Sequence, residues 1–102
     1  MKSRRVVLLD DAVGDLDAAV SFYESMECGL GDYCFDSLIS DIEGLTFFAG
    51  IHPVHFGAHC LRAKRFPFNI YYEWDDEKVV VLGVLDMRQQ PEKSLQRLRS
   101  RE

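Results

Sequence analysis

Apolar residues in the first half of the chain recur with a helical period. In residues 12–28 they return every three or four positions, as on one face of a helix. The same spacing continues through residues 30–48. Gly29 and Gly31 indicate where the first helix ends. Two helices joined by so few residues form an antiparallel hairpin. The positions that define the two stripes are Val13, Leu16, Val20 and Tyr23, followed by Leu30, Cys34, Leu38, Ile42 and Leu45.

The apolar period changes to two in the second half, which predicts strands. Residues 68–74 alternate, and residues 78–87 are almost entirely apolar, as expected of a central strand. We expect further strands at residues 60–65 and 4–9, and we interpret residues 50–59 as a loop. In the alternating strand, Phe68, Ile70, Tyr72 and Trp74 are predicted to face the core, and Asn69, Tyr71 and Glu73 the opposite side.

These elements predict an α+β fold in one domain, residues 1–102. An N-terminal β-strand and an antiparallel helical hairpin would pack on a three- to four-stranded antiparallel β-sheet. A short C-terminal helix after Pro91 would be marginal alone, because only Leu95 and Leu98 are apolar there. No apolar run approaches the roughly 20 residues that span a bilayer, and none resembles a signal peptide. We therefore expect a cytoplasmic protein without a membrane partner.

Charge is unevenly distributed along this chain of net charge −5. Residues 6–59 contain ten acidic side chains and no Lys or Arg, whereas residues 60–102 contain nine basic and seven acidic ones. An acidic helical hairpin repels nucleic acid, so we expect no direct specific DNA binding. The three cysteines form no CxxC pair, which favours reduced and buried thiols; they are Cys28, Cys34 and Cys60.

The densest basic cluster precedes the alternating strand. Arg62, Lys64 and Arg65 fall within four positions, and on a strand Arg62 and Lys64 share a face. Arg88, at the end of the apolar strand, could approach them. Two interpretations are open: an ordinary solvated strand face, or a surface that holds a phosphate or an acidic peptide.

Three segments, taken in order, resemble the RelE/ParE superfamily of toxins from bacterial type II toxin–antitoxin modules. They are DLDAAVSFYES, GLGDYCFDSL and LRAKRFPFNIYYEWDDEKVVVLGVLDMRQQP, and the resemblance extends from about residue 6 to residue 91. The basic strand, the aromatic strand, the acidic turn and the VVV strand ending in Arg before Pro are typical of the ParE-like branch, the plasmid stabilization proteins.

The resemblance implies a toxin that binds and inhibits DNA gyrase and is neutralised by a cognate antitoxin, with a homodimer or a heterotetramer with the antitoxin as the assembly. The alternative is a RelE-like ribosome-dependent mRNA endonuclease, and a non-toxic orphan member is a third reading. The ribonucleases use a tyrosine near the C-terminus, whereas after Arg88 this chain has neither Tyr nor His, and the matching position falls near Leu95. We therefore expect that the protein is not an enzyme and has no catalytic residues.

The candidate site residues follow from this resemblance. We expect the partner-binding residues to be Arg62, Lys64, Arg65, Tyr71 and Arg88, and the basic tail to contribute to target binding through Lys93, Arg97, Arg99 and Arg101. A zinc site at His52, His55, His59 and Cys60 uses suitable ligand types, but the spacing matches no familiar pattern. We predict no metal and no cofactor.

Overall fold

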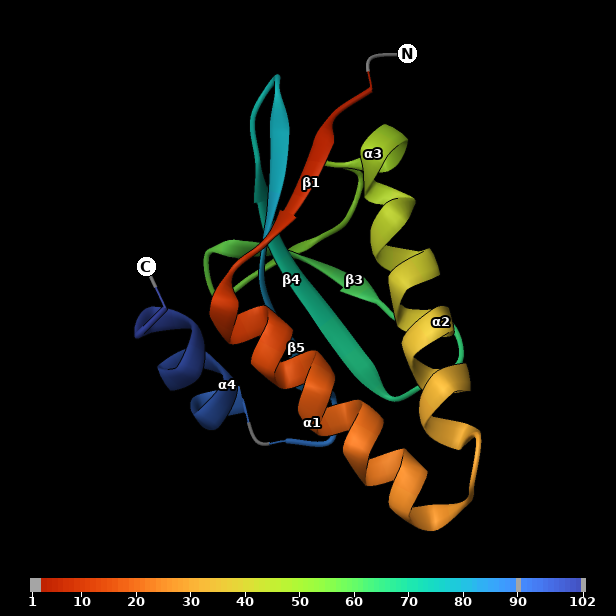
Figure 1. The fold of residues 1–102 in the computed structure, drawn as a ribbon. Coiled ribbons are helices and arrows are strands. Elements are labelled where there is room, and N and C mark those ends of the chain that lie inside the picture. Colours follow the sequence, from red (N-terminus) through yellow and green to blue (C-terminus); the bar gives the residue numbers. More distant parts are fainter. Residues whose placement is uncertain (1–2, 90, 102) are drawn as a thin grey trace.

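In the computed structural model, which describes residues 3–89 and 91–101, two helices pack against a twisted five-stranded sheet and a short helix follows the last strand (Figure 1). The predicted α+β fold class is confirmed, but the sheet has five strands and is mixed, rather than three- to four-stranded and antiparallel. The elements are β1 Arg5–Leu8, α1 Asp10–Met26, α2 Leu30–Glu43, α3 Leu45–Phe48, β2 Val54–His55, β3 Ala58–Arg62, β4 Phe68–Trp74, β5 Lys78–Asp86 and α4 Pro91–Arg99.

The sheet has the order β1-β5-β4-β3-β2. Strands β2 to β5 pair in antiparallel fashion, as consecutive hairpins do, whereas β1 pairs in parallel with β5, with Val6 opposite Val79. The apolar β5 is thus flanked on both sides, as its composition requires. A register shift at Tyr71 and Tyr72 marks a bulge in β4.

The segment interpreted as a loop, residues 50–59, contains β2 and the start of β3, so this expectation was wrong. Phe56 and Gly57 connect the two strands with φ values of 57° and 82°. Both lie in the left-handed region that a two-residue hairpin turn needs. The usual sequence signal for such a turn is Asn-Gly. This turn has Phe-Gly instead, so the sequence does not indicate it.

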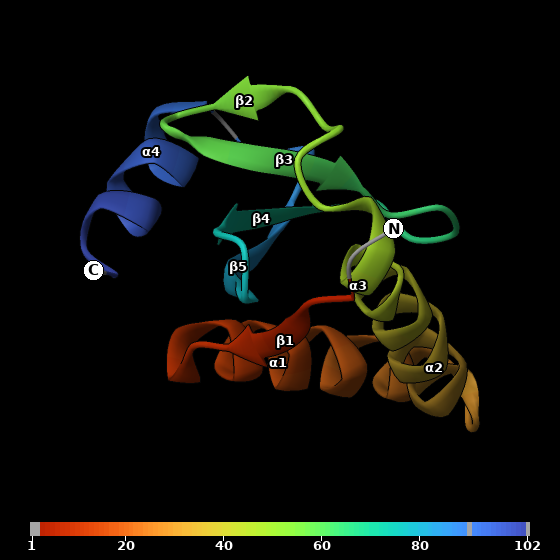
Figure 2. The same cartoon turned by 90° about the horizontal axis from the view of Figure 1, so that it is seen from above.

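Two apolar clusters hold the layers together. The larger one lies between the helical hairpin and the sheet and includes Leu38, Ile42, Ile70 and Tyr72. The smaller one lies on the opposite face, where Leu98 of α4 packs with buried residues of the strands. Figure 2 shows α1 and α2 along one side of the sheet and α4 well apart from α2. The strand residues of the smaller cluster are Ala58, Tyr71, Leu82 and Leu85.

Several side chains differ from the expected burial. Trp74 was expected in the core but is exposed at the end of β4, where the guanidinium of Arg4 lies 4.5 Å from its ring centre. Cys34 is buried and Cys60 partly buried, whereas Cys28 is exposed in the turn between the helices. Across residues 3–89 and 91–101, no helix has the length and apolar content that crossing a membrane requires.

Candidate functional site

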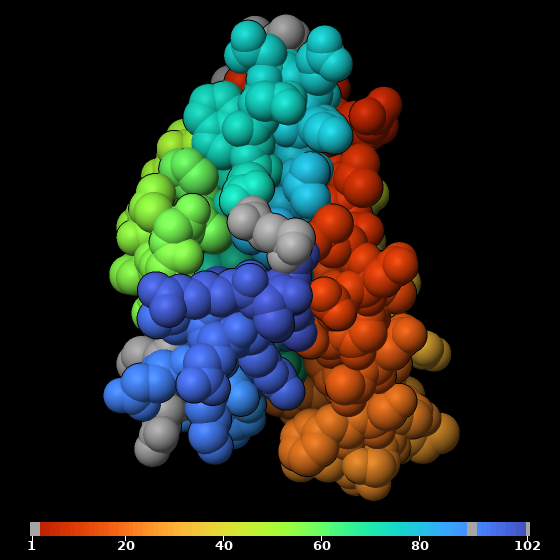
Figure 3. Space-filling view, turned by 90° about the vertical axis from the view of Figure 1, so that its left-hand side faces the viewer, coloured from red at the N-terminus to blue at the C-terminus, as the bar shows by residue number. Residues whose placement is uncertain are grey.

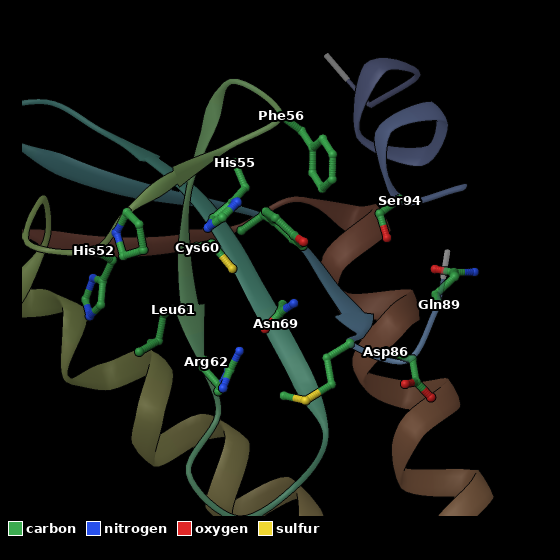
Figure 4. Close-up of a pocket in the computed structure, with 13 residues that line it drawn as sticks. His52, His55, Phe56, Cys60, Leu61, Arg62, Asn69, Asp86, Gln89 and Ser94 are labelled. Carbon is green, nitrogen blue, oxygen red and sulfur yellow. The ribbon is translucent and has the colours of Figure 1, made fainter. Parts of the chain in front are cut away.

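A groove of about 540 Å³ lies on the face of the sheet opposite the helical hairpin (Figure 4). The β2–β3 hairpin forms one wall, β3 and β4 form the floor, and the end of β5, residues 87 and 89, and Ser94 of α4 form the other wall. Its volume is typical of a ligand pocket. The lining residues are His52, Pro53, His55, Phe56, Cys60, Leu61, Arg62, Asn69, Tyr71, Asp86, Met87, Gln89 and Ser94.

The aromatic part of the groove comes from Phe56 and Tyr71. Phe56 is the only residue other than glycine with a positive φ in the described part of the chain. A left-handed conformation costs a residue with a Cβ about 1–2 kcal/mol. The conformation places the Phe56 ring 6.2 Å from the ring centre of Tyr71, with 38 % of Phe56 still exposed. Strain of this kind is often found at functional sites. Phe56 is not among the predicted site residues, and no local signal in the sequence indicates it.

Several polar groups line the groove. Arg62 is exposed at its rim, and the carbonyl oxygen of the Gln89 side chain is buried without a hydrogen-bond partner among the described residues. Burial raises the pKa of the Tyr71 hydroxyl and of the Cys60 thiol. Both groups therefore remain protonated near neutral pH and can donate hydrogen bonds, while a thiol with a raised pKa is a poor nucleophile.

The predicted partner-binding residues do not converge on one site. Arg62 and Tyr71 line the groove, and Tyr71 lies on the face predicted for it, although it is 3 % exposed rather than open to solvent. Because β3 ends at Arg62, Lys64 and Arg65 lie in the following turn and both are exposed. Arg88, after β5, forms a 2.7 Å ion pair with Asp86.

The basic tail is also divided. Arg101 is held by Asp15 of α1 through two hydrogen bonds of 2.5 and 3.0 Å, so it is not a free cation. Arg97 lines a second hollow, between α1 and α4, while Lys93 and Arg99 are exposed on α4. Leu98 and Arg101 attach this segment to the sheet and to α1.

His52 and His59 form hydrogen bonds within the described part of the chain. The Tyr72 hydroxyl accepts the N–H of Gly50 and lies 2.5 Å from Nδ1 of His52. His59 donates from Nδ1 to the carbonyl of His52 and accepts the indole N–H of Trp74 at Nε2. Burial lowers the pKa of His52. Across residues 3–89 and 91–101, no three His, Cys, Asp or Glu side chains are grouped so that they could hold a metal ion.

The fold is thus a helical hairpin on one face of a mixed sheet, with a short terminal helix on the other. A matching solved structure is titled "Chromosomal ParDE TA system from P. aeruginosa"; 80 % of this chain superposes on 94 % of that one, with a TM-score of 0.69 and 18 % sequence identity. The comparison confirms the predicted ParE-like fold. No protein-family model and no curated protein matches the sequence.

Proposed function

We propose that this chain is the toxin of a type II toxin–antitoxin system, that it inhibits DNA gyrase by binding, and that a cognate antitoxin neutralises it in the cytoplasm. The observation that carries the proposal is the fold: nearly the whole of a chain from a ParDE toxin–antitoxin system superposes on it. The groove adds support, because its protonated hydroxyl and thiol, exposed cation and aromatic wall suit recognition of a partner.

The antitoxin segment that fits this groove is extended and carries an acidic residue. Arg62 would pair with its carboxylate, and Phe56 and Tyr71 would contact an apolar side chain beside it. Strand β2 lies at the edge of the sheet next to the groove, so a peptide could also pair with the β2 backbone. The turn cations Lys64 and Arg65, together with Arg88, would then act outside the groove.

Pulse labelling after induced expression in a bacterial host tests the proposed function. We expect DNA synthesis to stop before protein synthesis, with filamentous cells. If protein synthesis stops first, the alternative of a ribosome-dependent mRNA endonuclease is favoured. If growth continues unchanged, the chain has the fold of a toxin but is not toxic.

Copurification with the candidate antitoxin tests the groove. Arg62→Glu should weaken the complex by about tenfold or more, because it reverses the cation that faces the partner. Lys78→Glu makes the same charge change at the start of β5 and should have little effect. Equal weakening by both variants would contradict a role for the groove.

A further inference from the structure

A second hollow, outside the groove, lies beside α1. A hollow of about 260 Å³ separates α1 from α4, and Figure 3 shows it between the two segments. The hollow is distinct from the groove in Figure 4; of the residues that line it, only Asp86 lines both. Its floor is apolar and comes from both layers of the fold, through Ala19, Tyr23, Phe68 and Val84.

The α1 bank of this hollow is apolar and open. Ala18, Phe22 and Met26 follow one another at intervals of four residues, so they share one side of the helix. Phe22 is 55 % exposed and Met26 is 63 % exposed, which is unusual for side chains of this size on the same flank. The row spans about 12 Å along the helix axis, about two turns.

The acidic residues around the hollow are already neutralised. At the N-terminal end of the row, Asp15 is paired with Arg101, and Asp11 lies 3.9 Å from the same guanidinium. Asp86 is paired with Arg88 through two hydrogen bonds of 3.0 and 2.7 Å. A ligand in the hollow therefore meets no unpaired carboxylate from these residues.

The opposite bank presents free positive charge. Arg97 of α4 lines the hollow and Lys93 lies one helical turn before it, on the same side of α4. Both are exposed, and within residues 3–89 and 91–101 neither forms an ion pair closer than 4.0 Å. The hollow thus has one apolar bank and one basic bank, separated by an apolar floor.

We propose that this surface binds an amphipathic helix of a partner protein that carries acidic residues along one flank. A third helix seated between α1 and α4 would place its apolar residues on Phe22, Met26 and the floor. Its acidic flank would face Arg97 and Lys93, which supplies the charge complementarity. A nucleic acid is disfavoured, because ten acidic side chains and no basic ones occupy residues 6–59.

Fluorescence anisotropy with two synthetic peptides tests the proposal on the full chain. Both peptides are helices of about 18 residues, or five turns, with leucines along one face. Beside that face, one peptide carries glutamates and the other carries lysines. We expect the glutamate peptide to bind at least about tenfold more tightly than the lysine peptide. Absent binding, equal binding of both peptides, or preferential binding of a DNA duplex would overturn the proposal.

Charge reversal separates recognition from folding. In a Lys93→Glu, Arg97→Glu double variant the preference should invert, so that the lysine peptide binds more tightly; loss of fold alone cannot produce an inversion. Phe22→Ser should weaken both peptides, and Lys78→Glu, at the far end of β5, should leave the preference unchanged. An uninverted preference in the folded double variant, verified by circular dichroism, would place the binding elsewhere and refute the proposal.

Discussion

Substitution of Arg101 by methionine removes the guanidinium that links α4 to α1 and β5. The side chains of Arg101 and Asp15 are only 10 % and 12 % exposed. Asp15 accepts two N–H groups from Arg101, at 2.5 and 3.0 Å, and its Oδ2 also accepts the backbone N–H of Val84 at 3.0 Å. The substitution therefore leaves a largely buried carboxylate with one hydrogen-bond donor in place of three.

The expected cost follows from this arrangement. Removing one partner of a buried ion pair typically costs about 3–5 kcal/mol. The remaining Val84 N–H reduces the penalty here, so we expect Arg101→Met to lower the free energy of unfolding by about 2–3 kcal/mol. Asp15→Asn should cost less, about 1–2 kcal/mol, because the freed arginine can turn toward solvent while the asparagine keeps the bond to Val84. The coupling energy between the two substitutions should be about 1 kcal/mol or more.

Urea denaturation measures these values. Far-UV circular dichroism and the fluorescence of Trp74, the single tryptophan, provide two independent probes. Arg99→Met is the matched control, since Arg99 is exposed and forms no ion pair within residues 3–89 and 91–101. If Arg101→Met falls within about 0.5 kcal/mol of Arg99→Met, the attachment of α4 does not depend on this ion pair and the reasoning is refuted.

Three further predictions concern residues 50–57, which lead into and form the β2–β3 hairpin. Burial lowers the pKa of His52, so the stability that its neutral form contributes should be complete above the unfolded pKa of 6.5 and should be lost as the pH falls through the folded pKa. Thermal unfolding at several pH values should show this decline. In the His52→Gln variant, the unfolding temperature should depend less on pH over this range. Gly50→Ala should lower the free energy of unfolding in urea by about 2 kcal/mol or more, because Gly50 has a φ of 95° and an added Cβ would lie 2.5 Å from the Trp74 ring. Gly57→Ala should cost less, because Gly57 also has a positive φ but an added Cβ there meets no neighbour. Equal costs for the two variants would argue against the clash with Trp74. Phe56→Asn should be about 1 kcal/mol more stable than Phe56→Ala, because asparagine tolerates a positive φ, and an alanine variant of equal or greater stability would show that the turn is unstrained.

The sequence predicted the elements whose apolar period is long. The helical hairpin and strands β4 and β5 follow directly from such periods, and the layered packing follows from the faces that they leave apolar. The hairpin of β2 and β3 could not be predicted, because its turn depends on a left-handed Phe56 that packing against Tyr71 favours. Local patterns describe neighbours along the chain and do not record contacts of this kind.

Only some of the residues that line the groove were predicted, because local patterns do not show which distant segments meet. Charge singled out Arg62, alternation placed Tyr71 on the open face, and the family resemblance suggested a binding role for both; they line one groove. Their expected association with Lys64 required β3 to continue, but it ends at Arg62. The pairing of Arg101 with Asp15 joins positions 86 residues apart, which no local pattern indicates.

The parallel pairing of β1 with β5 has a consequence for how the chain reaches its native state. Arg5 lies opposite Lys78, so a contact across more than seventy residues must form before β5 has neighbours on both sides. Strand β4 can pair with β5 early, because a three-residue acidic turn, residues 75–77, connects them locally, whereas closing the long loop to β1 is entropically slow.

 Until that loop closes, one edge of an almost entirely apolar strand is unpaired, which is the arrangement that promotes aggregation and strand exchange between molecules. The time during which a newly made chain is vulnerable is therefore set by the docking of its first strand.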